Sequence, residues 1–211
     1  MYNVIIIGAG GFGREVYNWA QESLPQNEFK INGFLDIDKN ALDNYDIDIN
    51  ILGTEDTYNI QEHDRFIIAV GNIELKKKIV EKIKSRNGEF MTLVHKTALV
   101  ACTAKIGEGV VICPFAYVSD NVILDNFVML NFYASCGHDA KIGEYSILSP
   151  YATVNGFVVL EEEVFLATHS TVIAYKKVGA KSKVSANSAV MHNVPPNSLV
   201  FGVPGSEKTI K

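Results

Sequence analysis

The sequence predicts a small α/β domain followed by a domain of short, stacked β-strands. Two observations predict this architecture. A glycine-rich loop directly follows an apolar segment near the N-terminus, and a six-residue repeat runs without insertion from about residue 94 to 194. The chain has 211 residues, which is enough for two small domains.

The repeat places an aliphatic residue at every sixth position. Sixteen of seventeen positions are Val, Ile or Leu, and the exception, Cys136, also belongs to a readily buried residue type. The positions are Val94, Val100, Ile106, Ile112, Val118, Leu124, Leu130, Cys136, Ile142, Leu148, Val154, Leu160, Leu166, Val172, Val178, Val184 and Val190. A small or β-branched residue follows four residues after each position, except at Lys176.

A period of six favours strands over helices. It is a multiple of the strand period of two, and it does not match the helical period of 3.6. Each repeat therefore predicts a short strand and a corner, with the aliphatic side chain pointing inward. A single strand of this kind cannot bury its apolar face alone, whereas stacked coils can.

The glycine-rich loop has the context of a phosphate-binding motif. Residues 4–7 predict a buried strand, and G-x-G-x-x-G over residues 8–13 leads into a helix predicted from Arg14. Glycines let the backbone approach a phosphate, and a helix N-terminus favours its negative charge. A second strand over residues 31–35 ends at Asp36, where an acidic residue can bind a ribose hydroxyl.

The remainder of the first domain is short. A third strand over residues 66–70 ends at Gly71, and a helix over residues 73–86 follows. A dinucleotide site needs two mononucleotide-binding halves, and residues 1–92 supply little more than one. The length favours a ligand the size of a nucleotide-linked sugar. NAD binding and a purely structural domain are the alternatives.

Composition excludes several classes of protein. The net charge of −5 and the pI of about 5.5 do not favour nucleic acid, whose phosphates require a basic face. No apolar run is long enough for a membrane span, and no signal peptide is recognisable. The three cysteines form no C-x-x-C pair, which is typical of free thiols in the cytoplasm. No cluster of His, Cys and Asp has metal-ligand spacing, so we expect no catalytic metal.

The repeat resembles that of the hexapeptide-repeat acyltransferases, in which Gly often follows the aliphatic residue. Ile106-Gly107, Ile142-Gly143 and Val178-Gly179 fit this pattern. The resemblance implies a left-handed parallel β-helix of 18 residues per coil over residues 93–211, after a Rossmann-like domain over residues 1–92.

The combination of both domains is similar to the sugar acetyltransferases related to the bacillosamine N-acetyltransferase and the sialic acid O-acetyltransferases. The motifs are Gly8 to Gly13, Gly71-Asn72, Asn131-x6-His138-Asp139 and Asn155-Gly156. The chain departs from these relatives at Phe12 and Ile147, where they carry His. The resemblance implies acetyl-CoA as co-substrate, a nucleotide-linked amino sugar as acceptor, and a homotrimer with sites between subunits.

The resemblance also assigns roles to individual residues. His138 corresponds to the general base, and Asp139 to the acidic neighbour that orients it. The expected acetyl-CoA residues are Gly156, Thr168, Ala174 and Ala186. The expected nucleotide-sugar residues are Gly10, Gly11, Phe12, Gly13, Arg14, Asp36, Gly71, Asn72 and Asn131.

An 18-residue coil places His138 in one column with Asp120, Gly156 and Ala174, about 4.8 Å apart. Gly156 and Ala174 then leave a groove for the pantetheine arm, and the N–H of Gly156 is placed to bind the thioester oxygen. Imidazole suits proton removal near neutral pH. The leading hypothesis is N-acetylation. The alternatives are sugar O-acetylation and a non-catalytic scaffold that binds a nucleotide.

The other histidines and Cys136 have simpler interpretations. We expect His63 and His192 at the surface and His95 in a structural role, while a role of His169 near the co-substrate stays open. Cys136 occupies the inward register and is expected to be a core thiol. Large apolar residues outside the inward register favour subunit interfaces. They are Phe115, Tyr117, Phe127, Met129, Phe132, Tyr133, Phe157 and Phe165.

Overall fold

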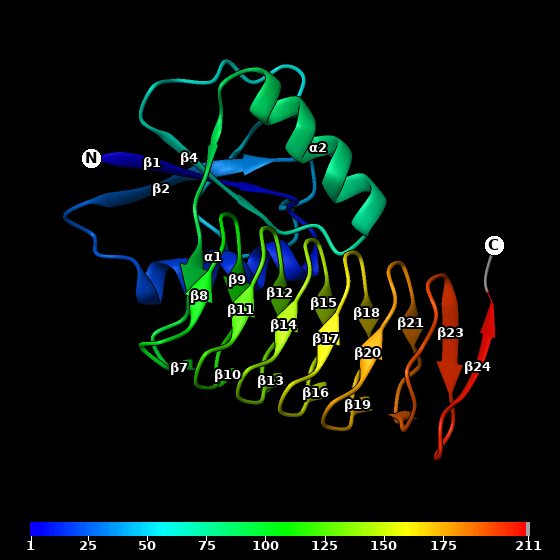
Figure 1. Cartoon of the computed structure of the whole chain (residues 1–211). Helices are drawn as coiled ribbons and strands as arrows, with labels where there is room; N and C mark the ends of the chain where they lie inside the picture. Colours follow the sequence, from blue (N-terminus) through cyan, green and yellow to red (C-terminus); the bar gives the residue numbers. More distant parts are fainter. Residues whose placement is uncertain (210–211) are drawn as a thin grey trace. The chain divides into compact units, whose positions relative to one another are not determined.

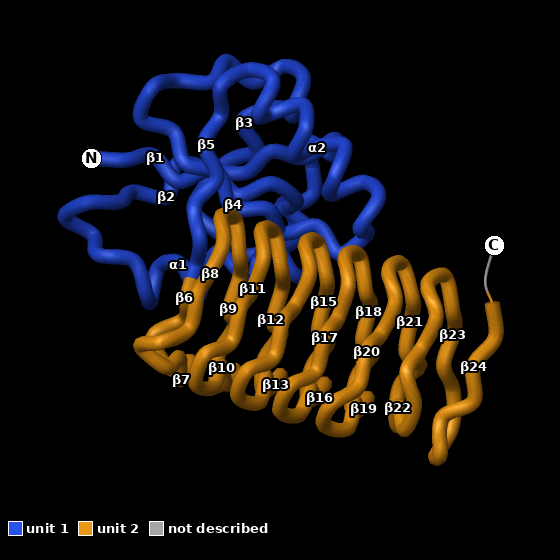
Figure 2. The backbone as a smooth tube through the Cα atoms, viewed as in Figure 1, with its two compact units in different colours: residues 1–93 blue, residues 94–211 orange. Residues whose placement is uncertain are grey.

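The computed structural model describes residues 1–209 and contains two compact units, residues 1–93 and 94–211 (Figure 2). Each unit is described by itself. Together they match the expected fold class, an α/β domain and a parallel β-helix.

Unit 1 is a five-stranded parallel sheet with strand order β3-β2-β1-β4-β5 and two helices (Figure 1). The strands are β1 (Tyr2–Ile7), β2 (Phe29–Leu35), β3 (Ile51–Gly53), β4 (Asp64–Ile68) and β5 (Glu89–Phe90). The helices are α1 (Gly11–Ser23) and α2 (Ile73–Ser85). The apolar runs of β1 and β4 are buried, as expected for central strands of a parallel sheet.

Several elements of unit 1 differ from the prediction. Helix α1 begins at Gly11, three residues earlier than Arg14, because glycines are compatible with a first helical turn that packs closely on the preceding loop. Strand β4 ends at Ile68, two residues before Val70, because the chain turns away there into α2. Strand β3 was not predicted. It is only three residues long and pairs only with the end of β2.

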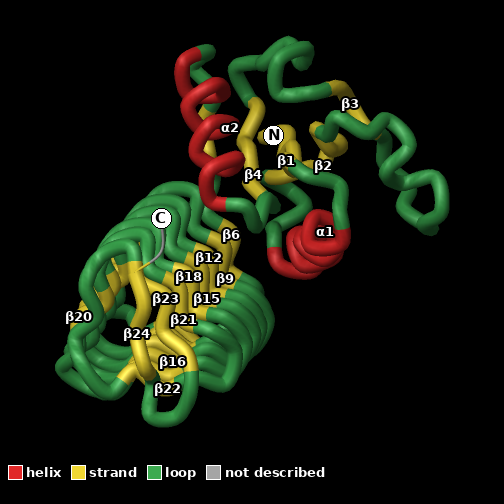
Figure 3. Tube along the Cα trace, turned by 90° about the vertical axis from the view of Figure 1, so that its right-hand side faces the viewer, coloured by secondary structure: helices red, strands yellow, loops and turns green. Residues whose placement is uncertain are grey.

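Unit 2 is a prism of three sheets wound as coils, in which the strands pair in parallel except for the last pair, β23 and β24 (Figures 1 and 3). The first sheet contains β7 (Leu99–Val100), β10 (Tyr117–Val118), β13 (Ser135–Cys136), β16 (Thr153–Val154), β19 (Thr171–Val172) and β22 (Ala189–Val190). The second contains β8 (Lys105–Ile106), β11 (Ile123–Leu124), β14 (Lys141–Ile142), β17 (Val159–Leu160) and β20 (Lys177–Val178). The third contains β6 (Leu93–Val94), β9 (Val111–Ile112), β12 (Met129–Leu130), β15 (Ile147–Leu148), β18 (Phe165–Leu166), β21 (Lys183–Val184), β23 (Ser198–Phe201) and β24 (Ser206–Thr209).

The strand register confirms the 18-residue coil. Cys136 pairs with Val118 on one side and with Val154 on the other. The inward residues from Ile112 to Val190 are buried and form one continuous core. Val94 is 37% exposed, contrary to the expected inward position, and Val100 and Ile106 are only half-buried, because these residues belong to the end coil and no earlier coil covers them.

The corners depend on a backbone conformation that the repeat did not reveal. The residue three positions after the inward one has a positive φ near 60° in coil after coil, and several of these residues are aromatic. Such a φ is unusual for bulky residues. At one corner Phe115, Tyr133, Tyr151 and His169 stack in sequence, with ring centroids 5.1, 4.9 and 4.6 Å apart.

Two of the residues expected on outer walls or corners are buried. Phe127 is 2% exposed, because it stacks on Tyr145 and its ring fills the space beside Gly109. Met129 is 3% exposed and lies in register between Val111 and Ile147, which are also buried. Phe115, Tyr117, Tyr133 and Phe157 are exposed as expected, and Phe132 and Phe165 are half-buried.

Candidate active site

His138 lies at an exposed corner of the prism, two residues after the end of β13. Its side chain is 58% exposed, and its Nδ1 lies 2.9 Å from Oδ2 of Asp139. A carboxylate can only accept a hydrogen bond, so Nδ1 carries the proton and Nε2 of the neutral ring has a free lone pair. The pair therefore presents a base at Nε2.

Local backbone features hold this pair in place. A Cβ on Gly137 would lie 2.7 Å from backbone atoms of Asn155 and Gly156, so the corner requires glycine there. Asp139 has φ 59°, and its N–H donates to the carbonyl of Asp120 at 2.9 Å. Asp tolerates this left-handed conformation better than most residues.

The imidazole of His138 lies directly against Gly156. A Cβ on Gly156 would be 2.7 Å from both Cε1 and Nε2 of the ring. The edge of Phe157 closes another side, with ring centroids 5.1 Å apart and an interplanar angle of 88°. The predicted column is therefore present, but the imidazole occupies the space over Gly156 that sequence reasoning left for the co-substrate. Gly156 itself is buried.

The N–H of Gly156 was predicted to bind the thioester oxygen. Within residues 1–209 no protein group accepts a hydrogen bond from it, whereas its carbonyl accepts from Tyr175 at 3.1 Å. The next residue of the column, Ala174, is half-buried. On the other side, the carboxylate of Asp120 accepts from Thr103 Oγ1 at 2.5 Å and from Asn121. The carboxylate of Asp120 thus binds Thr103 and Asn121 and not the imidazole of His138.

Thr168 and Ala186 lie at a different corner of the prism. Both are exposed, and the N–H of Asn187 donates to the carbonyl of Thr168 at 3.0 Å, so they occupy adjacent coils. They follow β18 and β21 of the third sheet, whereas Gly156 and Ala174 follow strands of the first. Within one chain the four expected acetyl-CoA residues therefore form two separate pairs.

The glycine loop contains two kinds of glycine. Gly8 has φ +98°, and a Cβ on Gly13 would lie 1.8 Å from the carbonyl oxygen of Gly8, so both are required by close packing. A Cβ on Gly10 or Gly71 would meet nothing within 4 Å, and one on Gly11 only the end of the Arg14 side chain, at 3.9 Å. Packing among the described residues therefore does not explain why glycine occupies these three positions.

The first turn of α1 leaves donors available. Its N-cap is Gly10, which provides no capping side chain, and the first turn has no acidic residue. The first N–H groups of a helix have no partner inside the helix. Together with the uncrowded glycines, this is an arrangement that suits a phosphate.

Asp36 holds the glycine loop. Its Oδ2 accepts from the N–H of Ala9 at 2.7 Å and its Oδ1 from the N–H of Asp38 at 3.0 Å. The sequence suggested a ribose contact for this carboxylate. In the structure its two oxygens accept backbone hydrogen bonds, one of them from the glycine loop. The negative charge next to the loop backbone stabilises the turn between β1 and α1.

Other expected residues also have partners within the chain. The side chain of Asn72 caps α2 by accepting from the N–H of Leu75 at 2.9 Å. The guanidinium of Arg14 lies 3.6 Å from the ring centroid of Tyr45. Phe12 packs edge-on against Trp19, with centroids 5.9 Å apart.

Asn131 belongs to unit 2, whereas the eight other expected nucleotide-sugar residues belong to unit 1. Its side-chain oxygen accepts from the N–H of Phe132 at 2.8 Å. Sequence reasoning missed two neighbours of the candidate sites. Phe157 directly follows the Asn155-Gly156 motif, so its position next to the site could have been predicted. Tyr45 lies in an acidic segment without periodicity, and nothing in the sequence indicated its contact.

The remaining histidines and Cys136 agree with their predictions. His95 is buried and its Nδ1 lies 2.8 Å from Thr97 Oγ1, while His63 and His192 are exposed. Cys136 is fully buried, and burial raises its pKa to about 12. No disulfide links the three cysteines. His169 stacks on Tyr151 at an exposed corner.

No helix within residues 1–209 is long and apolar enough to cross a bilayer. No group of three His, Cys, Asp or Glu side chains in the described part of the chain is arranged to hold a metal ion.

Comparison with known proteins agrees with this geometry. Residues 3–83 match the family model of the PglD N-terminal domain. This match confirms the resemblance for the domain that contains the glycine loop, and it lies outside the repeat. A segment of 47 residues is 45% identical to the UDP-N-acetylbacillosamine N-acetyltransferase of Bacillus subtilis (strain 168), covering 22% of each chain.

A longer alignment of 135 residues is 24% identical to the GDP-perosamine N-acetyltransferase of Escherichia coli O157:H7 and covers 64% of this chain. The chain spans 22% of the Bacillus relative and 61% of the Escherichia relative.

Solved structures share the whole fold. PerB from Caulobacter crescentus, in complex with CoA and GDP-perosamine, has a TM-score of 0.89 at 24% identity, covering 99% of this chain and 98% of that chain. The acetyltransferase domain of PglB from Neisseria gonorrhoeae FA1090, in complex with acetyl coenzyme A, has a TM-score of 0.88 at 24% identity and 98% coverage of both chains. At this identity the likeness establishes the fold.

Proposed function

We propose that the protein is an acetyl-CoA-dependent N-acetyltransferase that acts on the amino group of a nucleotide-linked sugar. The observation that carries this proposal is the His138–Asp139 pair, in which Nδ1 binds the carboxylate and the ring lies at an exposed corner, so that Nε2 can accept a proton when the imidazole is neutral. The relatives named above are N-acetyltransferases of nucleotide-linked amino sugars, and one related structure holds CoA together with such a sugar.

In the proposed reaction the amine nitrogen attacks the carbonyl carbon of the acetyl thioester. Nε2 of His138 accepts the proton that the nitrogen loses, while the carboxylate of Asp139 stabilises the imidazolium through Nδ1. The C–S bond breaks, and the sulfur of CoA leaves and takes up a proton. The N–H of Gly156 has no acceptor within residues 1–209 and would stabilise the oxygen as it gains charge.

The acceptor sugar would bind through its nucleotide to unit 1. The open glycines Gly10, Gly11 and Gly71 allow close approach of a phosphate, and the uncapped first turn of α1 supplies N–H donors. Unit 1 has a single glycine loop of this kind and two helices, which suits one nucleotide better than a dinucleotide. Reaction in the cytoplasm stays a prediction.

The two pairs of acetyl-CoA residues favour a shared site. Gly156 and Ala174 lie at one corner of the prism and Thr168 and Ala186 at another, an arrangement that suits an elongated co-substrate lying between two chains. We propose a homotrimer in which each acetyl-CoA lies between neighbouring chains.

The test is His138→Ala, assayed by CoA release with UDP-, dTDP- and GDP-linked amino sugars. The expected loss of kcat is about 10²–10⁴-fold with acetyl-CoA binding retained. Wild-type turnover by the variant would overturn the base. Acetylation of a sugar hydroxyl instead of an amine would identify an O-acetyltransferase, and no turnover with any sugar would favour a nucleotide-binding scaffold.

A further inference from the structure

Gly156 has a second feature that its backbone N–H does not explain. The three atoms nearest to a Cβ built on it all belong to the ring of His138: Cε1 and Nε2 at 2.7 Å and Nδ1 at 3.2 Å. Real Cβ contacts do not fall below 3.0 Å, so any other residue here would displace the ring. The absence of a side chain is what lets the imidazole lie there.

The ring is held from three directions. Asp139 accepts from Nδ1 at 2.9 Å, the edge of Phe157 stands nearly perpendicular to the ring plane, and Gly156 supports the side that carries Cε1 and Nε2. The imidazole is 58% exposed, so few other contacts limit its rotation. A hydrogen bond to one atom leaves a ring free to swing about that bond, and steric contacts are needed to fix Nε2.

We infer that Gly156 is a positioning residue that seats the imidazole of His138 and thereby aims Nε2 at the acceptor amine. This inference rests on the proposed function. It differs from a role of the Gly156 N–H as a donor, because an alanine would keep that N–H and add only a methyl group. Gly156→Ala therefore separates the two roles.

The fold should tolerate the change. The atoms that must move belong to the end of an exposed side chain and not to backbone, so the expected melting temperature is close to that of the wild type. A displacement of about 1 Å at a catalytic group can reduce the rate about 10²-fold. We expect Gly156→Ala to lower kcat by about 10–10²-fold and to change the KM for acetyl-CoA by less than about threefold.

Two measurements make the test specific. In NMR spectra of the wild type, the ring protons of His138 should show nuclear Overhauser contacts to Phe157, and Gly156→Ala should weaken them. In a His138→Ala background there is no ring to displace, so adding Gly156→Ala should lower the residual rate by a smaller factor than the same change lowers kcat in the wild type. This double variant is the matched control, because it introduces the same methyl group without the imidazole.

The outcomes distinguish the inference from the function on which it rests. Unchanged Overhauser contacts, unchanged kcat, or a rise in KM alone in Gly156→Ala would overturn the positioning role. Wild-type turnover by His138→Ala would overturn the assignment of His138 as the base. The positioning of its ring by Gly156 would then have no effect on catalysis. An equal fold loss from Gly156→Ala in the wild-type and His138→Ala backgrounds would assign the effect to the co-substrate groove instead.

Discussion

At the scale of single residues, Asp139 combines two demands. Its carboxylate binds Nδ1 of His138, and its backbone has φ 59°. Asn satisfies the backbone demand almost as well as Asp, because both tolerate the left-handed region. Asp139→Asn therefore removes the charge and leaves the corner intact.

We predict that Asp139→Asn lowers kcat by about 10–10³-fold, because the neutral amide stabilises the imidazolium less and no longer enforces one tautomer. Steady-state kinetics and circular dichroism of the folded variant check this. Asp139→Ala serves as a comparison, since it loses the same charge but also strains the corner. Equal kcat in wild type and Asp139→Asn would show that the carboxylate has no part in proton transfer.

The cysteines give a prediction that does not involve activity. Cys113 and Cys136 are buried and Cys102 is exposed, and burial raises the pKa of Cys136 to about 12. Only a thiolate reacts with a disulfide reagent, and a raised pKa keeps the thiol protonated. Titration of the native protein with such a reagent near pH 8 should detect one thiol rapidly and three after denaturation. Rapid reaction of a second thiol would contradict the buried register of Cys136.

At the scale of elements, the junction of β1 and α1 depends on two glycines that meet. The Cβ of an alanine at position 13 would overlap the carbonyl oxygen of Gly8, at 1.8 Å, and the obstacle is backbone that cannot rotate away. Gly71, after β4, has open space around it. Gly13 and Gly71 are thus the same residue type, but an added side chain would be crowded at position 13 and would have space at position 71.

We predict that Gly13→Ala lowers the free energy of unfolding by about 1–3 kcal/mol or more, as for overpacked interiors. Gly71→Ala should stay within about 0.5 kcal/mol of the wild type, yet weaken binding of the nucleotide-linked sugar. Urea denaturation and titration calorimetry measure the two effects. Full stability of Gly13→Ala would show that α1 can move away from β1. Unaltered sugar binding by Gly71→Ala would show that the segment between β4 and α2 is not part of the site.

The corners of the β-helix show how an element tolerates unfavourable backbone. Aromatic residues with positive φ at consecutive coils stack at 4.6–5.1 Å, close to the spacing of neighbouring strands. The stacking offsets part of the conformational cost, because aromatic pairs contribute about 0.5–1.5 kcal/mol beyond burial. These corners adopt the positive φ without glycine, whereas Gly109 (φ 65°) occupies the equivalent position after Ile106.

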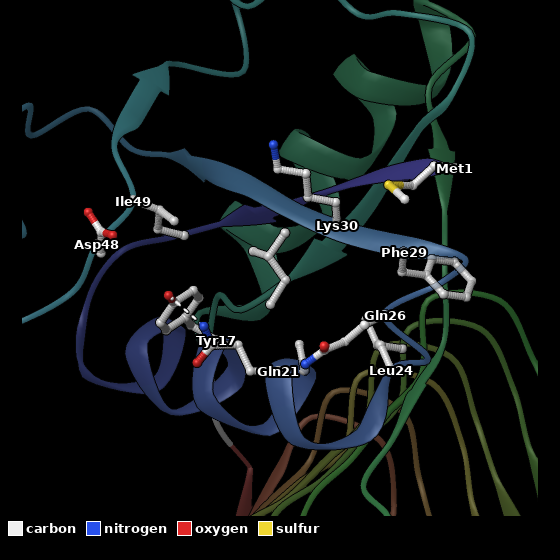
Figure 4. Close-up of a pocket in the computed structure, with 11 residues that line it drawn as sticks. Met1, Tyr17, Gln21, Leu24, Gln26, Phe29, Lys30, Asp48 and Ile49 are labelled. Atoms are coloured by element: carbon white, nitrogen blue, oxygen red, sulfur yellow. Dashed lines mark hydrogen bonds between the residues drawn. The ribbon is translucent and has the colours of Figure 1, made fainter.

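Unit 1 also contains a pocket of about 500 Å³ between α1 and the start of β2 (Figure 4). Tyr17 and Gln21 line it and are joined by a hydrogen bond of 2.7 Å. Burial, followed by the charge of Asp48, raises the pKa of Tyr17. The pocket is lined by the middle and end of α1, away from the glycine loop at its beginning, and the proposed function does not require it.

At the scale of the whole molecule, assembly is the main prediction. Exposed aromatic side chains on unit 2, among them Phe115 and Tyr175, leave apolar area that a partner would cover. Sedimentation equilibrium at micromolar concentration should give about three times the chain mass of 23.2 kDa. A fully active monomer would contradict both the trimer and the shared site.

Mixing two inactive variants provides a sharper test of the shared site. His138→Ala removes the base, and Thr168→Trp would block the other pair of acetyl-CoA residues. If each site takes one pair from each chain, mixed trimers formed after refolding together should regain part of the activity, because some interfaces then carry neither change. Absence of any recovery in verified mixed trimers would place the whole site in one chain.

The repeat was sufficient to predict short stacked strands and the inward residues from Ile112 to Val190. The family resemblance added the coil of 18 residues, which determines which residues are neighbours. The match of Cys136 with Val118 and Val154 follows from the repeat and that coil length together. The glycine loop was equally predictable, because a strand, a turn and a helix follow one another locally in the chain.

Side-chain placement and non-periodic contacts required the tertiary structure. The spacing placed His138 next to Gly156, but it did not indicate that the imidazole itself lies on Gly156, that Asp36 binds the loop backbone, or that Phe127 is buried. Periodicity determines where a Cα lies in the prism, and it predicts neighbours to within a column. Which atoms touch depends on rotamers and on contacts between segments distant in sequence, and these are selected only when the folded chain excludes the alternatives.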